Sequence, residues 1–332
     1  ARMVRYLNGI FAIAIWDARD GVLHLFRDPF GVKPLFYVER DGALGYASEL
    51  NALNALCGPF QLDKAFLFHF LGMLYYPAPW TAFEGVRSVE PGHYLVYQPS
   101  RLSDVGYYAP IFEYPEVGGD GLVEELGMRL ELAVRRQMVS DVPLGFFLSG
   151  GVDSSLVSFA AAGAGCVRPK TFSALVEDEA LNEREYARAV ARKIGSDHYE
   201  VSVPHFDIRA LERIIPRYGQ PFGDTSLLPT EMICGQIRRH VTVVLGGDGP
   251  DEMLCGYDRY SRARDFQGTA PDFFNSSYFR VSDGFRRSMI RRRHWQSTTY
   301  DLLSGHLELD RSLPIFRQMR CLDFRFFLEG DI

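Results

Sequence analysis

The chain has 332 residues, of which 47% are hydrophobic and 23% charged, a composition typical of a globular protein. Its 42 acidic residues outnumber its 36 basic residues, so we expect no nucleic acid among its partners. No apolar run approaches the roughly 20 residues of a membrane span, so we expect no membrane partner and no signal peptide. The five scattered cysteines lack a C-x-x-C pair, which favours a reducing, cytoplasmic location without disulfides.

The first hundred residues predict an antiparallel, β-rich meander with short helices. Apolar runs separated by turn signals such as Asp28-Pro29-Phe30-Gly31 are typical of paired strands. We expect strands over residues 10–16, 22–27, 35–38 and 44–47, helices over 49–56 and 64–71, and a hairpin with a Pro-Gly turn over 86–97. Residues 99–121 then lose periodicity and become rich in Pro, Gly, Ser and Tyr, which predicts a domain boundary near residue 115.

Residues 116–332 predict a second domain in which strands and helices alternate. We expect strands over 143–148, 170–176, 198–203 and 241–245, the last of them buried, and helices over 122–134, 182–194, 208–218 and 229–240. This alternation is typical of an α/β fold, a doubly wound parallel sheet with helices on both faces. The Arg-rich run over 285–295 indicates a solvated helix face, because the chain as a whole is acidic.

Residues 143–155 predict an anion site where a strand of this sheet ends. The apolar strand is followed by Ser149-Gly150-Gly151, where glycines permit a tight turn and a close approach of backbone N–H groups to a ligand. Asp153, Ser154 and Ser155 then open a helix, whose unpaired N–H groups and positive dipole end attract phosphate. No lysine follows the glycines, so this is not a Walker A loop. An ordinary β–α turn is the structural alternative.

A second strand, over 241–245, ends in a glycine-rich and acidic segment, Gly246-Gly247-Asp248-Gly249-Pro250-Asp251-Glu252. Three carboxylates within five residues repel one another unless a cation or a proton intervenes. Mg²⁺ in proteins takes one or two carboxylates together with phosphate oxygens. The alternative to a metal site is a set of acidic residues at a helix N-terminus, where the helix dipole favours them. Because ligands of such sheets bind at the carboxyl ends of the strands, the two loops together favour a magnesium–nucleotide site.

With both loops considered, the chain resembles the glutamine-hydrolysing asparagine synthetase family nearly end to end. The resemblance is carried by residues 7–12, 27–37, 47–49, 147–155, 171–173, 182–187, 221–226 and 247–257. The first three segments resemble the later half of the family's glutaminase domain, of the Ntn type, and the others resemble its ATP-pyrophosphatase domain. The domains expected are therefore a partial glutaminase-type amidotransferase domain over 1–115 and a synthetase domain, incomplete at its C-terminal end, over 116–332.

The resemblance implies an ATP-dependent ligase that converts aspartate to asparagine through a β-aspartyl-AMP intermediate, with ammonia from glutamine in the parent protein. It assigns the nucleotide to Leu148, Ser149, Gly150, Gly151, Asp153, Ser154, Ser155, Ser173, Ala174, Gly246 and Gly247, and Mg²⁺ to Asp153 and Asp251. Asp248 stands where the family more often has Glu, the residue that handles the ammonia proton, and its reach is shorter by one methylene. The implied partners are the small molecules aspartate, ATP, glutamine or ammonia, and a homodimer is the expected assembly.

Two other functions remain open at this point. One is a different amide-forming synthetase on the same scaffold, of the β-lactam synthetase or lasso-peptide cyclase type. The other is a catalytically silent nucleotide-binding module. If Asp153 and Asp251 share one Mg²⁺, their carboxylates should lie within roughly 5–6 Å, because each magnesium–oxygen bond is about 2.1 Å long.

The sequence also predicts what this chain should not do. The family's N-terminal nucleophilic cysteine and its later lysine have no counterpart here, so we expect a fragment that lacks both end segments. The 332-residue chain should therefore release no glutamate from glutamine above a protein-free blank in a coupled glutamate dehydrogenase assay. Glutamate production that scales with the concentration of this chain would contradict the prediction.

Overall fold

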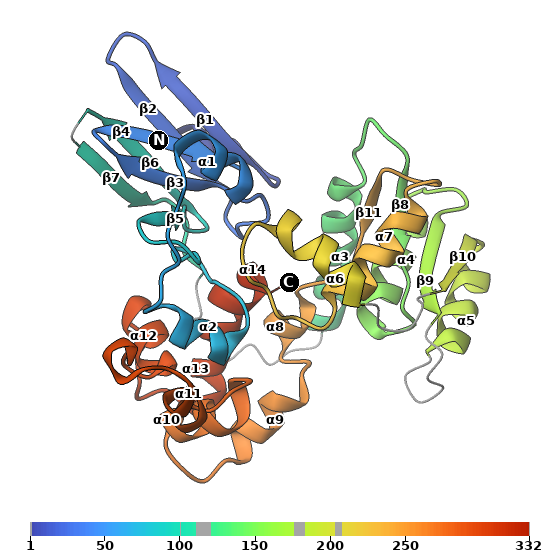
Figure 1. Ribbon diagram of the computed structural model, residues 1–332. Coiled ribbons are helices and arrows are strands. Elements are labelled where there is room, and N and C mark those ends of the chain that lie inside the picture. The colour runs from blue at the N-terminus through green and yellow to red at the C-terminus, as the bar shows by residue number, and fades with distance from the viewer. Residues whose placement is uncertain (1, 100, 111–120, 176–182, 203–207, 332) are drawn as a thin grey trace. The chain divides into compact units, whose positions relative to one another are not determined.

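The computed structural model describes the chain except for residues 1, 100, 111–120, 176–182, 203–207 and 332 (Figure 1). It divides into two compact units: the first comprises Ala1–Phe112, Ile215–Asp224 and Asp251–Ile332, and the second comprises Glu113–Ile214 and Thr225–Pro250. The domain boundary predicted near residue 115 lies outside the described residues and stays a prediction. In the described part of the chain, no helix combines the length and the apolar character that crossing a bilayer requires.

The strands described in the first unit form two antiparallel sheets rather than one meander. One sheet has the order β1-β2-β6-β7 and the other the order β4-β3-β5. Their bounds are β1 (Ala12–Asp17), β2 (Val22–Arg27), β3 (Phe36–Arg40), β4 (Ala43–Ala47), β5 (Val86–Ser88), β6 (His93–Gln98) and β7 (Arg101–Gly106). Since β5 pairs with β3 while β6 pairs with β2, the hairpin predicted over 86–97 is wrong. β7 was not predicted, because its residues show no apolar alternation.

The chain leaves the first sheet through a loop that is organised by the Asp28 carboxylate. Asp28 is fully buried directly after β2, and its two oxygens accept backbone N–H bonds of 3.0–3.3 Å from Phe11, Phe30, Val32 and Lys33. A buried carboxylate that is satisfied by several N–H groups holds one backbone conformation. The chain after β2 is therefore carried away from the sheet before β3 begins.

Buried charged groups also tie the β-rich part of the first unit to its helices. Arg27, on β2, pairs with Glu329 of α14 (Leu328–Gly330) at 2.7 Å, and the two side chains are only 4% and 7% exposed. The same guanidinium donates to the carbonyl oxygens of Gly31, Lys33 and Val89, so each of its nitrogens has an acceptor. Breaking one partner of such a buried pair typically costs about 3–5 kcal/mol of stability.

The helical part of the first unit packs around an aromatic core that includes Phe70, Tyr76, Phe274 and Phe326. Its helical segments are η1 (Arg2–Tyr6), α1 (Leu50–Cys57), α2 (Leu67–Met73), α8 (Pro250–Leu254), α9 (Asp258–Asp265), α10 (Ala270–Phe273), η3 (Phe274–Tyr278), α11 (Asp283–Met289), η4 (Arg292–His294), α12 (Thr299–His306), α13 (Ile315–Leu322) and η5 (Asp323–Phe327), followed by α14. The helices α1 and α2 confirm the two short helices expected over 49–56 and 64–71.

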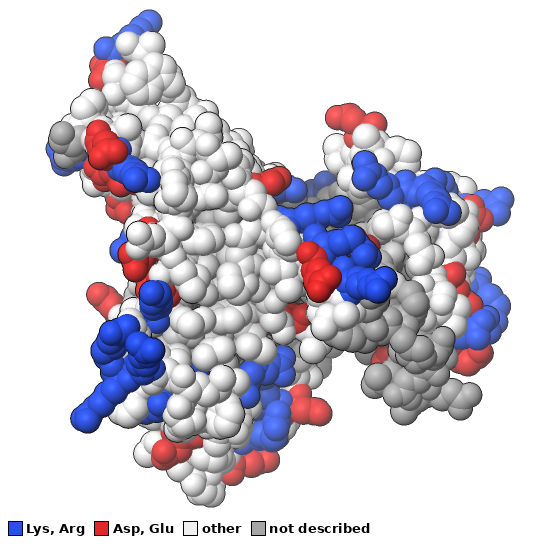
Figure 2. All heavy atoms as spheres, viewed as in Figure 1, with Lys and Arg blue, Asp and Glu red and all other residues white. Residues whose placement is uncertain are grey.

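The predicted solvated helix face over 285–295 is only partly correct. Arg286, on α11, is fully buried, pairs with Asp283, and donates to the Phe68 carbonyl and the Thr299 hydroxyl. The run of arginines 291–293 is exposed, and Figure 2 shows basic side chains gathered over the helical part of the first unit. The sequence could not separate the buried arginine from the exposed ones, because two of its partners, Phe68 and Thr299, lie on other segments.

The second unit contains a four-stranded parallel sheet with the order β10-β9-β8-β11. The strands are β8 (Leu144–Phe147), β9 (Lys170–Leu175), β10 (Asp197–Ser202) and β11 (Val243–Leu245), and the helices that connect them are α3 (Leu122–Gln137), α4 (Val152–Gly163), α5 (Arg184–Ile194), α6 (Ile208–Tyr218) and α7 (Leu227–Ile237). All strands and helices expected over 122–245 are present within a few residues of their predicted bounds.

Consecutive residues of β8 show that helices cover both faces of this sheet. Phe146 packs against Val157 of α4, whereas Phe147 packs against Ile237 of α7. Because neighbouring residues of a strand point to opposite faces, α4 and α7 lie on opposite sides of the sheet, which confirms the doubly wound prediction. β11 is a short edge strand in which Val243 is 38% exposed, so the prediction of a fully buried strand there is wrong.

Ion pairs connect α5 to β10, the strand at one edge of the sheet. Both Arg184 and Arg188 of α5 bind the Glu200 carboxylate of β10, at 2.8 and 2.5 Å. Hydrogen bonds from these two guanidinium groups lower the pKa of Glu200 to about 2. The ionised carboxylate is therefore favoured in the folded chain over the unfolded chain.

This pKa predicts how the stability of the second unit depends on pH. A carboxylate whose pKa falls on folding contributes stability that is complete above its unfolded pKa and lost as pH falls toward the folded value. For Glu200, this contribution should disappear between about pH 4.5 and 2. Urea unfolding at pH 7 should show Glu200→Gln to be less stable than the wild type, with the difference shrinking from pH 5 to pH 3. Glu131→Gln, at an exposed position of α3, is the control; equal pH profiles for Glu200→Gln and this control would contradict the assignment.

Candidate active site

The candidate site begins where β8 ends, at the carboxyl edge of the parallel sheet (Figure 1). The Leu148 side chain is fully buried and packs against Ala187 and Ala191 of α5, while its N–H donates to the Phe172 carbonyl at 2.8 Å. These contacts hold Leu148 in line with the strand. The chain turns only at Ser149, so the glycines that follow lie at the strand end, as the sequence predicts.

Helix α4 begins directly after the glycines and offers N–H groups that the helix itself does not use. Its first intrahelical hydrogen bond runs from the Ser155 N–H to the Gly151 carbonyl at 3.2 Å. Gly151 is the N-cap and has no side chain to accept a bond. The first N–H groups of any helix point away from its own acceptors, and the positive end of the helix dipole adds to their attraction for an anion.

The three serine hydroxyls hold the loop in shape through bonds to one another and to its backbone. Ser154 Oγ accepts from the Ser149 N–H at 3.2 Å and lies 2.9 Å from Ser149 Oγ. Ser149 Oγ in turn accepts from the Gly151 N–H at 3.2 Å, and Ser155 Oγ donates to the Gly151 carbonyl at 2.7 Å. The turn is thus formed before any ligand arrives, which lowers the ordering cost of binding.

Two glycines at the site have neighbours that exclude a side chain. A Cβ on Gly150, whose φ is +103°, would lie 2.5 Å from the Glu183 carbonyl oxygen. A Cβ on Gly247 would lie 2.7 Å from Ser154 N and 3.1 Å from the Asp153 Cβ. The second contact shows that the loop after β11 meets the loop after β8, as expected for neighbouring parallel strands.

Two further residues that were assigned to the nucleotide, Ser173 and Ala174, lie on the adjacent strand, at the end of β9. Ser173 is buried and donates from its hydroxyl to the Leu148 carbonyl, and Ala174 is half-buried beside it. On β10, His198 Nε2 lies 3.4 Å from Ser173 Oγ, and His198 Nδ1 lies 2.9 Å from Thr171 Oγ1. The second unit therefore brings together Leu148, Ser173 and the phosphate loop, although their contacts with a nucleotide stay a prediction.

Asp248 follows the glycines at the end of β11. The residue as a whole is exposed, yet its carboxylate is turned back so that Oδ2 would lie 2.5 Å from a Cβ on Gly246. This partial loss of water around the carboxyl group raises the pKa of Asp248 above its ordinary value. A carboxylate with a raised pKa is better suited to exchange a proton near neutral pH.

Asp251 and Glu252 belong to the first unit and differ in what surrounds them. Asp251, on α8, is half-buried, and its Oδ1 would lie 1.9 Å from a Cβ on Gly256, so only glycine fits there. Glu252 is fully buried, accepts a bond from the Tyr257 hydroxyl at 2.5 Å, and has its pKa raised by burial. Glu252, which was not among the predicted magnesium ligands, is therefore engaged with Tyr257 inside the first unit.

The shared-magnesium prediction stays untested, because Asp153 lies in the second unit, on the first turn of α4, and Asp251 lies in the first. One acid that the sequence analysis gave no role is Glu183, before α5. Its carbonyl contacts Gly150, and its Oε2 would lie 3.8 Å from a Cβ on Gly151. Its position in the Asn182-Glu183-Arg184 segment was the available signal, although Asn182 is outside the described residues.

The parallel sheet and the glycine-lined helix N-terminus at its strand ends define a doubly wound α/β protein. A family model described as Asparagine synthase matches residues 125–332, and one described as Glutamine amidotransferase domain matches residues 1–108. The chain belongs to the asparagine synthetase family.

Curated relatives agree with this assignment. Asparagine synthetase (glutamine-hydrolyzing) 1 of Bacillus subtilis (strain 168) is 33% identical over 258 residues, which cover 76% of this chain and 40% of the relative. Asparagine synthetase (glutamine-hydrolyzing) 3 of the same organism is 30% identical and covers 98% of this chain and 57% of the relative. Amidase chyE of Penicillium rubens is 28% identical over an alignment that covers 77% of this chain and 41% of the relative. The chain thus spans between 40% and 57% of the length of these relatives.

The contact between the two loops predicts that a methyl group added at Gly247 strongly weakens nucleotide binding. Gly247→Ala places a Cβ against backbone atoms that cannot move aside, so the N–H groups at the start of α4 should shift away from the phosphates. Loss of one charge-assisted hydrogen bond costs about 1.5–3 kcal/mol, so Mg-ATP should bind roughly 10–100-fold more weakly in equilibrium dialysis. Gly235→Ala is the matched control, because a Cβ on this α7 glycine has no neighbour within 4 Å. Equal affinities for the two variants would contradict the role of Gly247.

Proposed function

We propose that this chain carries the ATP-dependent part of an amide-forming ligase, which activates a carboxylic acid as an acyl-adenylate and transfers it to ammonia. The observation that supports the proposal most strongly is the contact of the two glycine loops at the N-terminus of α4. That contact brings backbone and glycines of the second loop against the first turn of α4, where helices generally bind anions. The membership of the family supports the same reaction class.

The loop after β8 fits the phosphates of ATP. In the proposal, the N–H groups at the start of α4 and the hydroxyls of Ser149, Ser154 and Ser155 hold the β- and γ-phosphates, which leave together as pyrophosphate. Gly150, Gly151, Gly246 and Gly247 let the backbone approach them. Leu148, Ser173 and Ala174 line the adenine side through backbone groups. The donors are fixed before reaction, so charge that develops on the leaving group meets an already oriented environment.

Two carboxylates are proposed to hold the magnesium ion that accompanies the nucleotide. Asp153 stands in the first turn of α4, and Asp251 on α8, and both offer the hard oxygen ligands that Mg²⁺ prefers. When bound, Mg²⁺ neutralises charge on the phosphates. In the proposal, Asp153 and Asp251 position the ion.

Asp248 is the proposed proton acceptor for the attacking ammonia. The raised pKa of this carboxyl group brings it closer to the working pH of a general base than an ordinary aspartate. Its side chain is one methylene shorter than glutamate, so it must reach the nucleophile from a closer backbone position. Asp248→Asn would remove the base and keep the shape of the side chain.

The acid substrate proposed is aspartate, with asparagine as the product, as the named relatives suggest. In the parent protein, the ammonia would come from glutamine through a glutaminase domain, of which residues 1–115 are the proposed part. Another amide-forming synthetase on this scaffold is the second candidate, and the similarity to Amidase chyE favours keeping it. The partners proposed are small molecules, and the cytoplasmic location and the homodimer stay predictions.

The proposal predicts a specific defect for Asp153→Asn. Loss of the negative charge should weaken magnesium positioning by several kcal/mol and lower ATP-dependent pyrophosphate release at least about 100-fold. Pyrophosphate release is measured with ATP, Mg²⁺, ammonium chloride and a panel of carboxylic acids that includes aspartate. Asp141→Asn, at an exposed position before β8, is the matched control and should keep wild-type activity.

The outcomes separate the candidate functions. Release that requires aspartate supports asparagine synthesis, and release that requires another acid of the panel supports the second candidate. Binding of ATP without release for any acid would favour the silent nucleotide-binding module and contradict the ligase. Wild-type release by Asp153→Asn would overturn the assignment of this residue to magnesium.

A further inference from the structure

Three side chains with metal-binding groups meet in the first unit, away from the glycine loops. Glu90 lies between β5 and β6, His93 begins β6, and Asp104 lies on β7, the strand that pairs with β6. One ligand atom from each of the three lies within 4.8 Å of the others. The side chains are 13%, 24% and 40% exposed, so the group is partly accessible to solvent.

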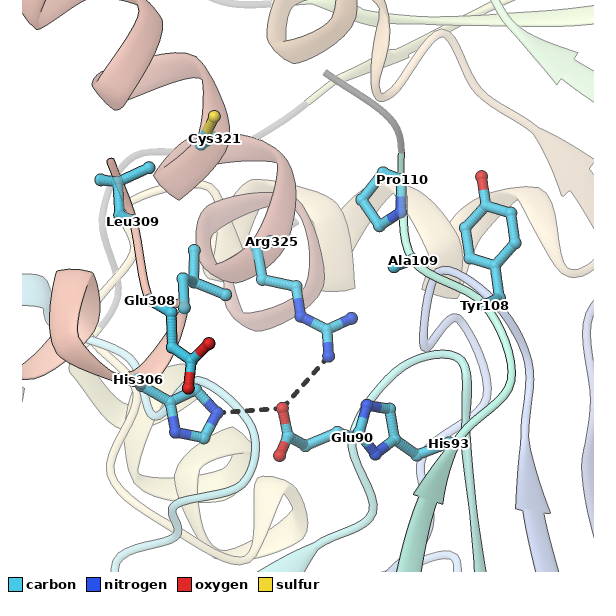
Figure 3. Close-up of a pocket in the computed structure, with 11 residues that line it drawn as sticks. Glu90, His93, Tyr108, Ala109, Pro110, His306, Glu308, Leu309, Cys321 and Arg325 are labelled. Carbon is cyan, nitrogen blue, oxygen red and sulfur yellow. Dashed lines mark hydrogen bonds and ion pairs between the residues drawn. The ribbon is translucent and has the colours of Figure 1, made fainter. Parts of the chain in front are cut away.

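Glu90 and His93 form part of the wall of a cavity of about 410 Å³. The opposite wall comes from the C-terminal helices and includes His306, Glu308 and Arg325. Figure 3 shows the His93 and His306 rings on either side of the Glu90 carboxylate, with Arg325 above it. The cavity has room for an ion together with several waters or a small ligand.

The groups that surround the cluster orient its ligand atoms. His93 Nδ1 lies 2.8 Å from Asp104 Oδ1, a contact that fixes the ring. Glu90 is held through one oxygen: both His306 Nε2, at 3.0 Å, and Arg325 Nη2, at 3.1 Å, bind Oε2. Among the described residues, no hydrogen bond engages Glu90 Oε1. Contacts of this kind to neighbouring groups hold metal ligands in place in many proteins.

The balance of charge around the cavity favours a cation. The cavity is lined by two carboxylates, those of Glu90 and Glu308, and by one permanent positive charge, that of Arg325. Asp104, which belongs to the cluster but not to the cavity lining, adds a third carboxylate. A single imidazole with two carboxylates is a mixed nitrogen and oxygen set, which suits Zn²⁺ better than Mg²⁺ or Ca²⁺. Arg325 weakens the attraction but does not cancel it.

We propose that Glu90, His93 and Asp104 bind Zn²⁺, with the fourth coordination position open to the cavity. Tetrahedral zinc with bonds of about 2.0–2.1 Å places its ligand atoms about 3.4 Å apart. To reach this geometry, the largest distance between two ligand atoms, at most 4.8 Å, must shorten by roughly 1.4 Å, and the distance from His93 Nδ1 to Asp104 Oδ1 must lengthen by about half an ångström. Asp104 is partly exposed, so its side chain can make this movement. The site is independent of the proposed ligase activity, since no residue of the glycine loops belongs to it.

The test is metal binding to the 332-residue chain after treatment with a chelator. Zn²⁺ is titrated in competition with a chromophoric chelator, and Co²⁺ is used as a second probe because its visible absorption reports tetrahedral ligation. One equivalent should bind, and His93→Ala should lower the affinity more than about 100-fold. His306→Gln, which removes only the support of Glu90, should lower it by about 10–100-fold. His294→Ala, at a partly buried histidine outside the cavity, is the control and should bind as the wild type does.

A second variant tests the charge argument in the opposite direction. Arg325→Gln removes the positive charge beside Glu90 while keeping a donor for the Pro91 carbonyl, so Zn²⁺ should bind several-fold more tightly. Circular dichroism checks that each variant is folded. Absence of stoichiometric binding to the wild type, or equal affinities for His93→Ala and His294→Ala, would overturn the proposal. Weaker binding by folded Arg325→Gln would do the same.

Discussion

The site in the second unit depends on one close approach between backbones, that of Gly247 to the peptide joining Asp153 and Ser154. The approach is possible because β11 and β8 are adjacent parallel strands, so the loops that follow them emerge at the same edge. It also requires the absence of a side chain at Gly247, since the nearest atom is a backbone nitrogen that cannot turn aside. Sheet topology and one glycine together decide where the N–H groups of α4 point.

Much of this site could be predicted from the sequence because its signals are local. An apolar run, glycines and a serine-rich helix start occur within 13 consecutive residues, from 143 to 155, and the second loop repeats the pattern. The strands and helices over 122–245 were predictable for the same reason, since their periodicity does not depend on distant partners. The hydroxyl bonds within the loop, such as Ser149 to Ser154, follow from this local chemistry.

What could not be predicted depends on contacts between distant segments. Whether β6 pairs with β5 or with β2 is decided by the loop around Asp28, whose partners span both sides of β2. Burial of Arg286 and Glu252 depends on Thr299, Phe68 and Tyr257, and no sequence pattern marks these pairs. Charged residues are usually exposed, so the expectation of a solvated arginine face followed the common case. Cavities such as the one beside Glu90 exist only once the helices have packed.

The pairing of Arg27 with Glu329 has a consequence for the order in which the protein forms during synthesis. The two residues are 302 positions apart, which is roughly 15–60 s of translation at about 5–20 residues per second. Until Glu329 is made, the β-rich segment that contains Arg27 lacks its carboxylate partner. The second unit ends at Pro250, so all of its sequence is made first. The nascent chain can therefore complete its second unit before α14, which carries the partner of Arg27, has been made.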